Sequence, residues 1–271
     1  MSRWLLLASL VAGCAGAGSG YRPLPAVDPA EVESSLFLIG DAGAPSARDE
    51  PVLRALTTAL GNAAGERVVV FLGDNIYPRG LPDSSSSGRE EAERRIDAQL
   101  DVVAKAGVRA IFVPGNHDWD RMGPDGWNAI RRQAARIAER GDSLIRMLPE
   151  DGCPGPVPVD VGTRLRIIAL DTQWWLHSGP KPEDRESACR ADREDEVADS
   201  LRADLERAGE GRHVVVVGHH PLATGGEHGG YFGFRDWLFP LRHAAPWLWV
   251  PLPGVGAIYP SFRQGGISNQ D

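Results

Sequence analysis

The sequence lacks an excess of basic residues, and this absence excludes a class of function. Lysine and arginine together number 29, against 37 aspartates and glutamates, so the net charge is −8. Proteins that bind nucleic acid generally neutralise phosphates with basic side chains. The charge balance therefore argues against nucleic acid as a partner. It does not exclude small phosphorylated substrates, which respond to the local charge of a site.

A long apolar run is also missing. The apolar stretch at the N-terminus, Trp4–Ala12, is too short for a membrane-spanning helix, which needs about 20 residues. Hydrophobic residues make up 42% of the 271 positions and charged residues 24%, which is typical of a globular protein. We find no internal repeat and no second domain boundary.

The N-terminus has the pattern of an export signal. A short basic start is followed by Trp4–Ala12 and then by small residues before Cys14. Val11-Ala12-Gly13-Cys14 resembles the lipobox of bacterial lipoproteins, in which the cysteine becomes the acylated first residue. The resemblance implies an exported, lipid-anchored protein, on the periplasmic face of the outer membrane in a Gram-negative cell and otherwise on the cell surface. An apolar start with a chance cysteine is the alternative.

Cysteine is scarce, with three in the chain. Apart from Cys14, the remaining two are Cys153 and Cys189. An even pair in an oxidising compartment is a disulfide candidate. Two unpaired buried thiols are the alternative.

The rest of the chain alternates between strand and helix patterns. We expect residues 1–14 to be a signal segment, residues 15–34 a flexible tether rich in Gly, Ala, Ser and Pro, and residues 35–271 one domain. Apolar runs of strand length lie at 35–39, 68–72, 110–113, 164–170 and 213–217. Helical spacing of apolar residues lies at 50–60, 89–106, 126–140 and 192–208. This alternation predicts an α/β fold with a sheet covered on both faces.

Four of the strand ends carry polar residues behind a glycine. These residues are Asp41, Asp74-Asn75-Tyr77, Asn116-His117-Asp118 and His219-His220. Ligands bind outside the carboxyl ends of strands in open α/β sheets, and glycine allows the sharp turn that exposes the next side chain. Any one of these residues could be a helix cap or a structural side chain. Together, oxygen and imidazole donors at four strand ends predict a metal centre.

The same residues carry a family resemblance. Gly-Asp-Ala-Gly at 40–43, Gly-Asp-Asn-Ile-Tyr at 73–77, Gly-Asn-His-Asp-Trp at 115–119 and Gly-His-His-Pro at 218–221 resemble the motifs of the calcineurin-like metallophosphoesterases. Within that family they resemble the purple acid phosphatase branch. Many relatives have a histidine where this sequence has Gly43, and the purple enzymes have a tyrosinate ligand where it has Tyr77.

The resemblance implies a fold and a set of metal ligands. The fold is a four-layer αββα sandwich of two mixed sheets. Asp41 and Tyr77 would bind the first metal, Asp74 would bridge both metals, and Asn116 and His219 would bind the second. The expected cofactors are two metal ions, Fe(III) with Fe(II), Zn or Mn. A neutral amide at Asn116 leaves a formal charge of about +1 on the loaded site, which favours a phosphate.

The implied reaction is hydrolysis of a small phosphomonoester by a metal-bridging hydroxide, as in an acid phosphatase. His117 and His228 are the candidate catalytic residues near the leaving group. Asp118 and His220 would orient the neighbouring ligands through hydrogen bonds.

One motif of the family is absent. Its Gly-His-x-His motif, with one histidine for each metal, occurs nowhere in this sequence. The resemblance therefore implies a domain that is incomplete at its C-terminus, either as a fragment of a longer enzyme or as a truncated gene product with reduced activity. One alternative is a non-catalytic surface lipoprotein that keeps the scaffold, and another is a phosphodiesterase with the same metal centre.

Overall fold

The computed structural model describes residues 27–140, 143–183, 187–209, 211–225, 233–243, 245–252 and 254–258. The signal segment, Cys14 and His228 lie outside these residues, so what was predicted for them stays a prediction. Among the described residues, no helix is both long and apolar enough to cross a membrane.

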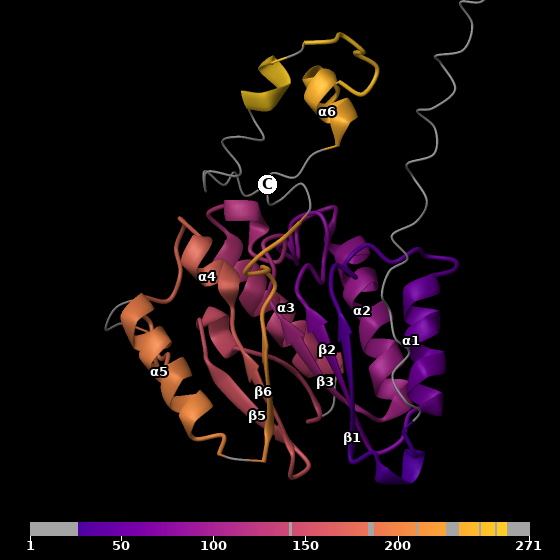
Figure 1. Ribbon diagram of the computed structural model, residues 1–271, viewed down its shortest axis with the longest axis vertical. Helices are drawn as coiled ribbons and strands as arrows, with labels where there is room; N and C mark the ends of the chain where they lie inside the picture. The colour runs from indigo at the N-terminus through magenta and orange to yellow at the C-terminus, as the bar shows by residue number, and fades with distance from the viewer. Residues whose placement is uncertain are drawn as a thin grey trace, which may run out of the picture.

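In the residues that the structure describes, seven strands form two sheets (Figure 1). The first sheet has the order β1-β2-β3-β4 and all its strands are parallel. The second has the order β5-β6-β7, in which β5 is antiparallel to β6 and β7 is parallel to it. The strands are β1 (Ser34–Ile39), β2 (Glu66–Leu72), β3 (Arg109–Val113), β4 (Ile145–Met147), β5 (Val157–Val161), β6 (Leu165–Ala169) and β7 (His213–Val217).

The first sheet is therefore parallel, and the prediction of two mixed sheets is wrong for it. The reason lies in its connections. A helix follows each of β1, β2 and β3 before the next strand of the sheet, and such a crossover returns the chain in the same direction. Among the described strands, β5 and β6 alone are joined by a short turn, and they are antiparallel.

Helices cover the outer face of each sheet (Figure 1). The helices are α1 (Pro51–Asn62), α2 (Arg89–Ala106), α3 (Gly126–Arg140), α4 (Thr172–Leu176), α5 (Glu194–Glu206) and α6 (Phe234–Leu238). The first three lie beside the parallel sheet, and α4 and α5 lie on the far side of the second sheet. Helices, two sheets and helices give the expected four layers. Short 3-10 turns are η1 (Pro29–Glu31), η2 (Asp120–Met122), η3 (Glu150–Gly152), η6 (Pro240–His243) and η7 (Val255–Ala257).

The continuous apolar run of β2 is explained by its place in the middle of these layers. Val69 and Phe71 join the core under the helices, whereas Val68 and Val70 join the core between the sheets. All four side chains have 0% exposure. Because successive side chains of a strand point to opposite faces, a strand buried on both sides needs apolar residues at every position. The ring of Phe71 stacks on that of Phe112 in β3, with centroids 4.4 Å apart.

The last residues of the predicted tether already contact the domain. Ser34 is the first residue of β1, and Glu33 accepts hydrogen bonds from the backbone and hydroxyl of Thr163.

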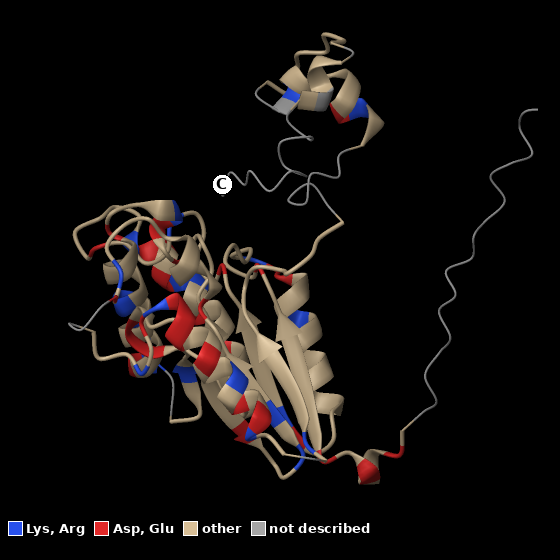
Figure 2. Cartoon of the chain, turned by 60° about the vertical axis from the view of Figure 1, so that its left-hand side comes forward, with Lys and Arg blue, Asp and Glu red and all other residues tan. Residues whose placement is uncertain are grey.

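The Cys153 and Cys189 side chains form a disulfide, with Cα atoms 5.5 Å apart. It joins the loop before β5 to the segment before α5. Figure 2 shows acidic and basic residues interspersed along the helices.

Candidate metal centre

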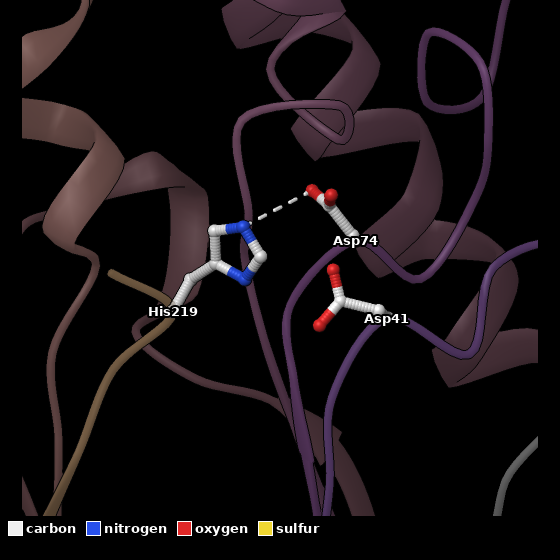
Figure 3. Close-up of side chains that lie close together, drawn as sticks. All are labelled: Asp41, Asp74 and His219. Carbon is white, nitrogen blue, oxygen red and sulfur yellow. Dashed lines mark ion pairs between the residues drawn. The ribbon is translucent and has the colours of Figure 1, made fainter. Parts of the chain in front are cut away.

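Side chains from four strand ends meet at one edge of the sandwich. Asp41, Asp74 and Asn116 follow β1, β2 and β3 of the parallel sheet, and His219 follows β7 of the second sheet. One ligand atom from each of Asp41, Asp74 and His219 lies within 4.8 Å of the others. Figure 3 shows both carboxylates and the imidazole directed into the same space. The prediction that these strand ends converge is confirmed, whereas their roles as metal ligands stay predictions.

The two aspartates stand on strained backbone. Asp41 has φ 58° and Asp74 has φ 54°, both in the left-handed region. Residues other than glycine rarely adopt it, and a strained conformation of this kind costs about 1–3 kcal/mol. Asp41 is held there by its backbone N–H, which donates to the Gly73 carbonyl across 3.1 Å. Both carboxylates lie in the space that they share with His219 (Figure 3).

Glycines around the site leave room for the turns that carry the candidate ligands. A Cβ at Gly115 would lie 2.4 Å from the Asp74 Oδ1, and one at Gly73 would lie 2.6 Å from the His219 ring. A Cβ at Gly43 would lie 2.3 Å from the Asp74 carbonyl oxygen. Gly43 is thus the position where the first turn packs against the second. No histidine could replace it on this backbone, which gives a steric reason for the departure at this position.

His219 presents a lone pair to two oxygen atoms. Its Nδ1 lies 2.9 Å from the Leu72 carbonyl, which can only accept, so Nδ1 carries the proton. The other nitrogen, Nε2, lies 3.0 Å from the Asn116 Oδ1 and 3.4 Å from the Asp74 Oδ1. In the neutral ring, three acceptors then face one another. A cation placed among them would relieve that repulsion.

This donor set fits a metal ion. A metal-binding histidine usually donates its other ring nitrogen to a carbonyl or carboxylate, as His219 does to Leu72. Carboxylate, amide and imidazole donors suit Zn, Mn and Fe. In the part of the chain that the structure describes, no further histidine, cysteine or carboxylate joins this group.

Tyr77 lies beside Asp41. Its hydroxyl donates to the Asp41 Oδ1 across 3.0 Å, and its backbone N–H donates to the Gly43 carbonyl across 3.0 Å. Burial and the negative charges of Asp74 and Asp41 raise the pKa of Tyr77 well above its usual value. The phenol is therefore neutral without a cation. A bound metal reverses this, because its charge favours the phenolate.

His117 is oriented by the same loops. Its Nδ1 donates to the Pro78 carbonyl across 2.6 Å, and its backbone N–H donates to the Asp74 Oδ1 across 3.0 Å. The Nε2 therefore faces the site, 3.8 Å from the Asp74 Oδ2. The imidazole packs on Tyr77 with ring centroids 4.3 Å apart.

Asp118 is a fully buried side chain that joins two of the loops. It accepts hydrogen bonds from the backbone N–H groups of Gly115, Asn75 and Ile76, and from the Asn75 side chain. Burial and the negative charge of Asp74 raise its pKa, and the N–H donors oppose that shift. These contacts fix the turn that carries Asn116 onto the turn that carries Asp74. The role of Asp118 in orienting a metal ligand stays a prediction.

Sequence reasoning missed two residues at the end of β6. Thr172 has its hydroxyl 2.8 Å from the His220 Nδ1, and Asp171 accepts the indole N–H of Trp119 across 2.8 Å. Asp171 is fully buried and also caps α4 through the backbone N–H groups of Gln173 and Trp174. The signal in the sequence was a polar residue, Asp171, after a strand. It was passed over because no glycine precedes it, unlike at the other four strand ends.

The comparison with protein families agrees with this geometry. Residues 35–247 match the family model described as calcineurin-like phosphoesterase. No curated protein matches the chain. The matched range contains all four strand ends, and members of this family typically bind two metal ions and hydrolyse phosphoesters. The chain therefore belongs to the calcineurin-like phosphoesterase family.

Proposed function

We propose that this protein is a lipid-anchored phosphomonoesterase of the purple acid phosphatase type. Its first metal position would be formed by Asp41, Tyr77 and Asp74, and its second by Asp74, Asn116 and His219. Each position then has three protein donors, which is the number that catalytic metal sites commonly use. The proposed ions are Fe(III) at the first position and Fe(II), Zn or Mn at the second.

The observation that carries this proposal is the contact between Tyr77 and Asp41. The phenol oxygen lies 3.0 Å from a carboxylate oxygen at the position where a cation would need both. Gly43 leaves no space for an alternative side chain, because its Cβ would collide with Asp74. A phenolate is a hard anionic donor and suits Fe(III) better than a divalent ion.

The remaining residues support hydrolysis of a phosphate ester. When bound, two metal ions supply positive charge for the phosphate and a nucleophile at mild pH. Asn116 and His219 add no negative charge, so the loaded site stays attractive to an anion. His117 directs its Nε2 into the site while Nδ1 is held by Pro78. The His117 Nε2 is therefore the nitrogen placed to give a proton to the leaving oxygen. His228 lies outside the described residues, and its role remains part of the proposal.

Export and lipid anchoring are proposed from Cys14 and the apolar segment before it. The disulfide between Cys153 and Cys189 supports export, because such bonds persist in oxidising compartments. A phosphodiesterase is the second candidate, since the family's metal chemistry serves both ester types. A lipoprotein that binds metal or phosphate without turnover is the third, favoured by the absence of the Gly-His-x-His motif from this sequence.

The three candidates separate in one experiment. The protein is loaded with iron and zinc, and its rates on an aryl phosphate and on the corresponding bis-aryl phosphate are compared. We expect a higher kcat/KM for the monoester, with the activity lost in Asp74→Asn. A preference for the diester would favour the second candidate. Metal bound at two ions per chain with no turnover of either ester would favour the third.

A further inference from the structure

The residues that follow β6 lie beside the residues that follow β7. The two strands are parallel neighbours, with Ala169 paired to Val217. The backbone N–H of Leu170 donates to the Val217 carbonyl across 2.9 Å, which continues the pairing beyond the strands. Thr172 consequently stands next to the turn that carries His219 and His220. Its side chain has no part in the chemistry proposed above.

The Thr172 hydroxyl holds that turn by two contacts. Its oxygen accepts the backbone N–H of His220 across 3.1 Å and lies 2.8 Å from the Nδ1 of the same residue. Gly218 makes the approach possible, because a Cβ there would lie 2.8 Å from the Thr172 methyl carbon. One hydroxyl therefore fixes both the backbone and the ring of His220.

The neighbouring His219 is fixed from the opposite sheet. Its Nδ1 donates to Leu72 at the end of β2, while the backbone after it is held by Thr172 at the end of β6. The dipeptide 219–220 thus connects the carboxyl ends of both sheets. The direction of the His219 Nε2 toward the Asn116 Oδ1, 3.0 Å away, depends on both contacts.

Asp171, the residue before Thr172, contacts the segment that carries Asn116. Asp171 accepts the indole N–H of Trp119, which stands three residues after Asn116. The first turn of α4 therefore contacts the segment that carries Asn116 and the segment that carries His219. These two side chains form the second metal position of the proposed function.

We propose that Thr172 is a positioning residue for the second metal ion. Its hydroxyl holds the 219–220 backbone so that the His219 Nε2 and the Asn116 Oδ1 face one point. This inference rests on the proposed metal centre. Residues that orient metal ligands typically contribute about 10- to 100-fold to metal affinity.

The test compares two substitutions that differ in one group. Thr172→Val keeps the shape and removes the hydroxyl, and Thr172→Ser keeps the hydroxyl. Zn²⁺ affinity is measured by competition with a chelating dye. The His219→Ala variant shows how much of the Zn²⁺ binding takes place at this site. We expect Thr172→Val to lose about 10- to 100-fold in Zn²⁺ affinity. Thr172→Ser should stay close to the parent.

Thr57→Val is the matched control. Its hydroxyl donates within α1 to the Leu53 carbonyl, away from the site, so its removal should leave Zn²⁺ affinity unchanged. Circular dichroism and metal-free melting curves show that each variant is folded. If Thr172→Val does not fold, Thr172→Ala carries the same expectation, because it removes the hydroxyl without adding volume.

Two results would overturn the inference while leaving the metal centre standing. One is unchanged Zn²⁺ affinity in Thr172→Val. The other is an equal loss in Thr172→Ser, which would assign the effect to the methyl group. Absence of any Zn²⁺ binding that His219→Ala removes would instead overturn the proposed metal centre and this inference together.

Discussion

The indole N–H of Trp119 donates to the Oδ2 of Asp171 across 2.8 Å, and both side chains are fully buried. The bond joins the loop after β3 of the first sheet to the end of β6 of the second. Burial raises the pKa of Asp171 from 3.8 to about 8, against the three N–H donors that favour its charged form. A raised carboxyl pKa makes stability depend on pH.

Asp171→Asn is predicted to remove one component of that dependence. Between pH 4 and 8, the folded protein holds a proton on Asp171 that the unfolded chain has released. This component of stability therefore falls as the pH rises through that range. The difference in unfolding free energy between the parent and Asp171→Asn should shift in favour of the variant as pH rises, measured by urea denaturation at several pH values. Parallel pH profiles would show that Asp171 is ionised throughout.

Gly43→Ala is predicted to destabilise the protein and weaken metal binding. The added methyl would lie 2.3 Å from the Asp74 carbonyl, and overpacking of this kind costs about 1–3 kcal/mol. Gly61→Ala is the control, because nothing lies within 4 Å of its Cβ and it stands in α1. Alanine there should gain up to about 1 kcal/mol through helix propensity. Thermal melting measures the stability of both variants, and Zn²⁺ titration measures their metal affinity. A Gly43→Ala protein as stable as Gly61→Ala would contradict the expected clash with the Asp74 carbonyl.

The disulfide is predicted to contribute substantially to stability. Closing a loop with a sequence separation of 36 residues is worth about 4 kcal/mol by chain-entropy arithmetic. The double variant Cys153→Ser with Cys189→Ser should lose stability of this order in urea denaturation. Non-reducing mass spectrometry of exported protein should show the bond directly. Recovery of two freely alkylated thiols would count against export as well as against the bond.

Tyr77→Phe tests the proposed tyrosinate. Iron-loaded parent protein should absorb visible light through charge transfer from the phenolate, and the variant should lose that band. The hydrogen bond from the phenol to Asp41 is exposed to solvent, so its removal should leave the fold intact, which circular dichroism verifies. A fully metal-loaded parent without a visible band would refute the purple acid phosphatase assignment.

Cys14→Ser tests the lipid anchor. We expect the variant to be released from membranes or to remain unprocessed, because the acyl acceptor is lost. Metabolic labelling with a fatty acid, followed by membrane fractionation, measures both outcomes. Membrane association that persists in the variant would show that another feature attaches the protein.

The long, strongly periodic elements were predictable. The predicted ranges 89–106, 126–140 and 213–217 agree with α2, α3 and β7, because an amphipathic helix or a buried strand imposes its period on the sequence. The strands β4 and β5 were missed. The first has only three residues, and the second contains Pro158, which a strand tolerates only at an edge.

The site residues that follow a glycine at the end of a strand could be predicted from the sequence. Asp41, Asp74, Asn116 and His219 all stand near glycines that make room for them. The part played by Thr172 could not be predicted, because it depends on which strand lies next to β6. That neighbour, β7, is more than 40 residues away in sequence and is set by sheet topology.

The placement of the proposed ligands after strands of two different sheets has a consequence for how the protein unfolds. Asp74 and Asn116 belong to the first sheet, while His219 belongs to the second, so an ion bound by all three acts as a cross-link between layers. Such an ion binds the assembled sandwich and not the separated sheets. Each tenfold rise in free ion above its dissociation constant then adds about 1.4 kcal/mol to stability. The amount of folded protein in the cell would follow the supply of metal as well as the temperature.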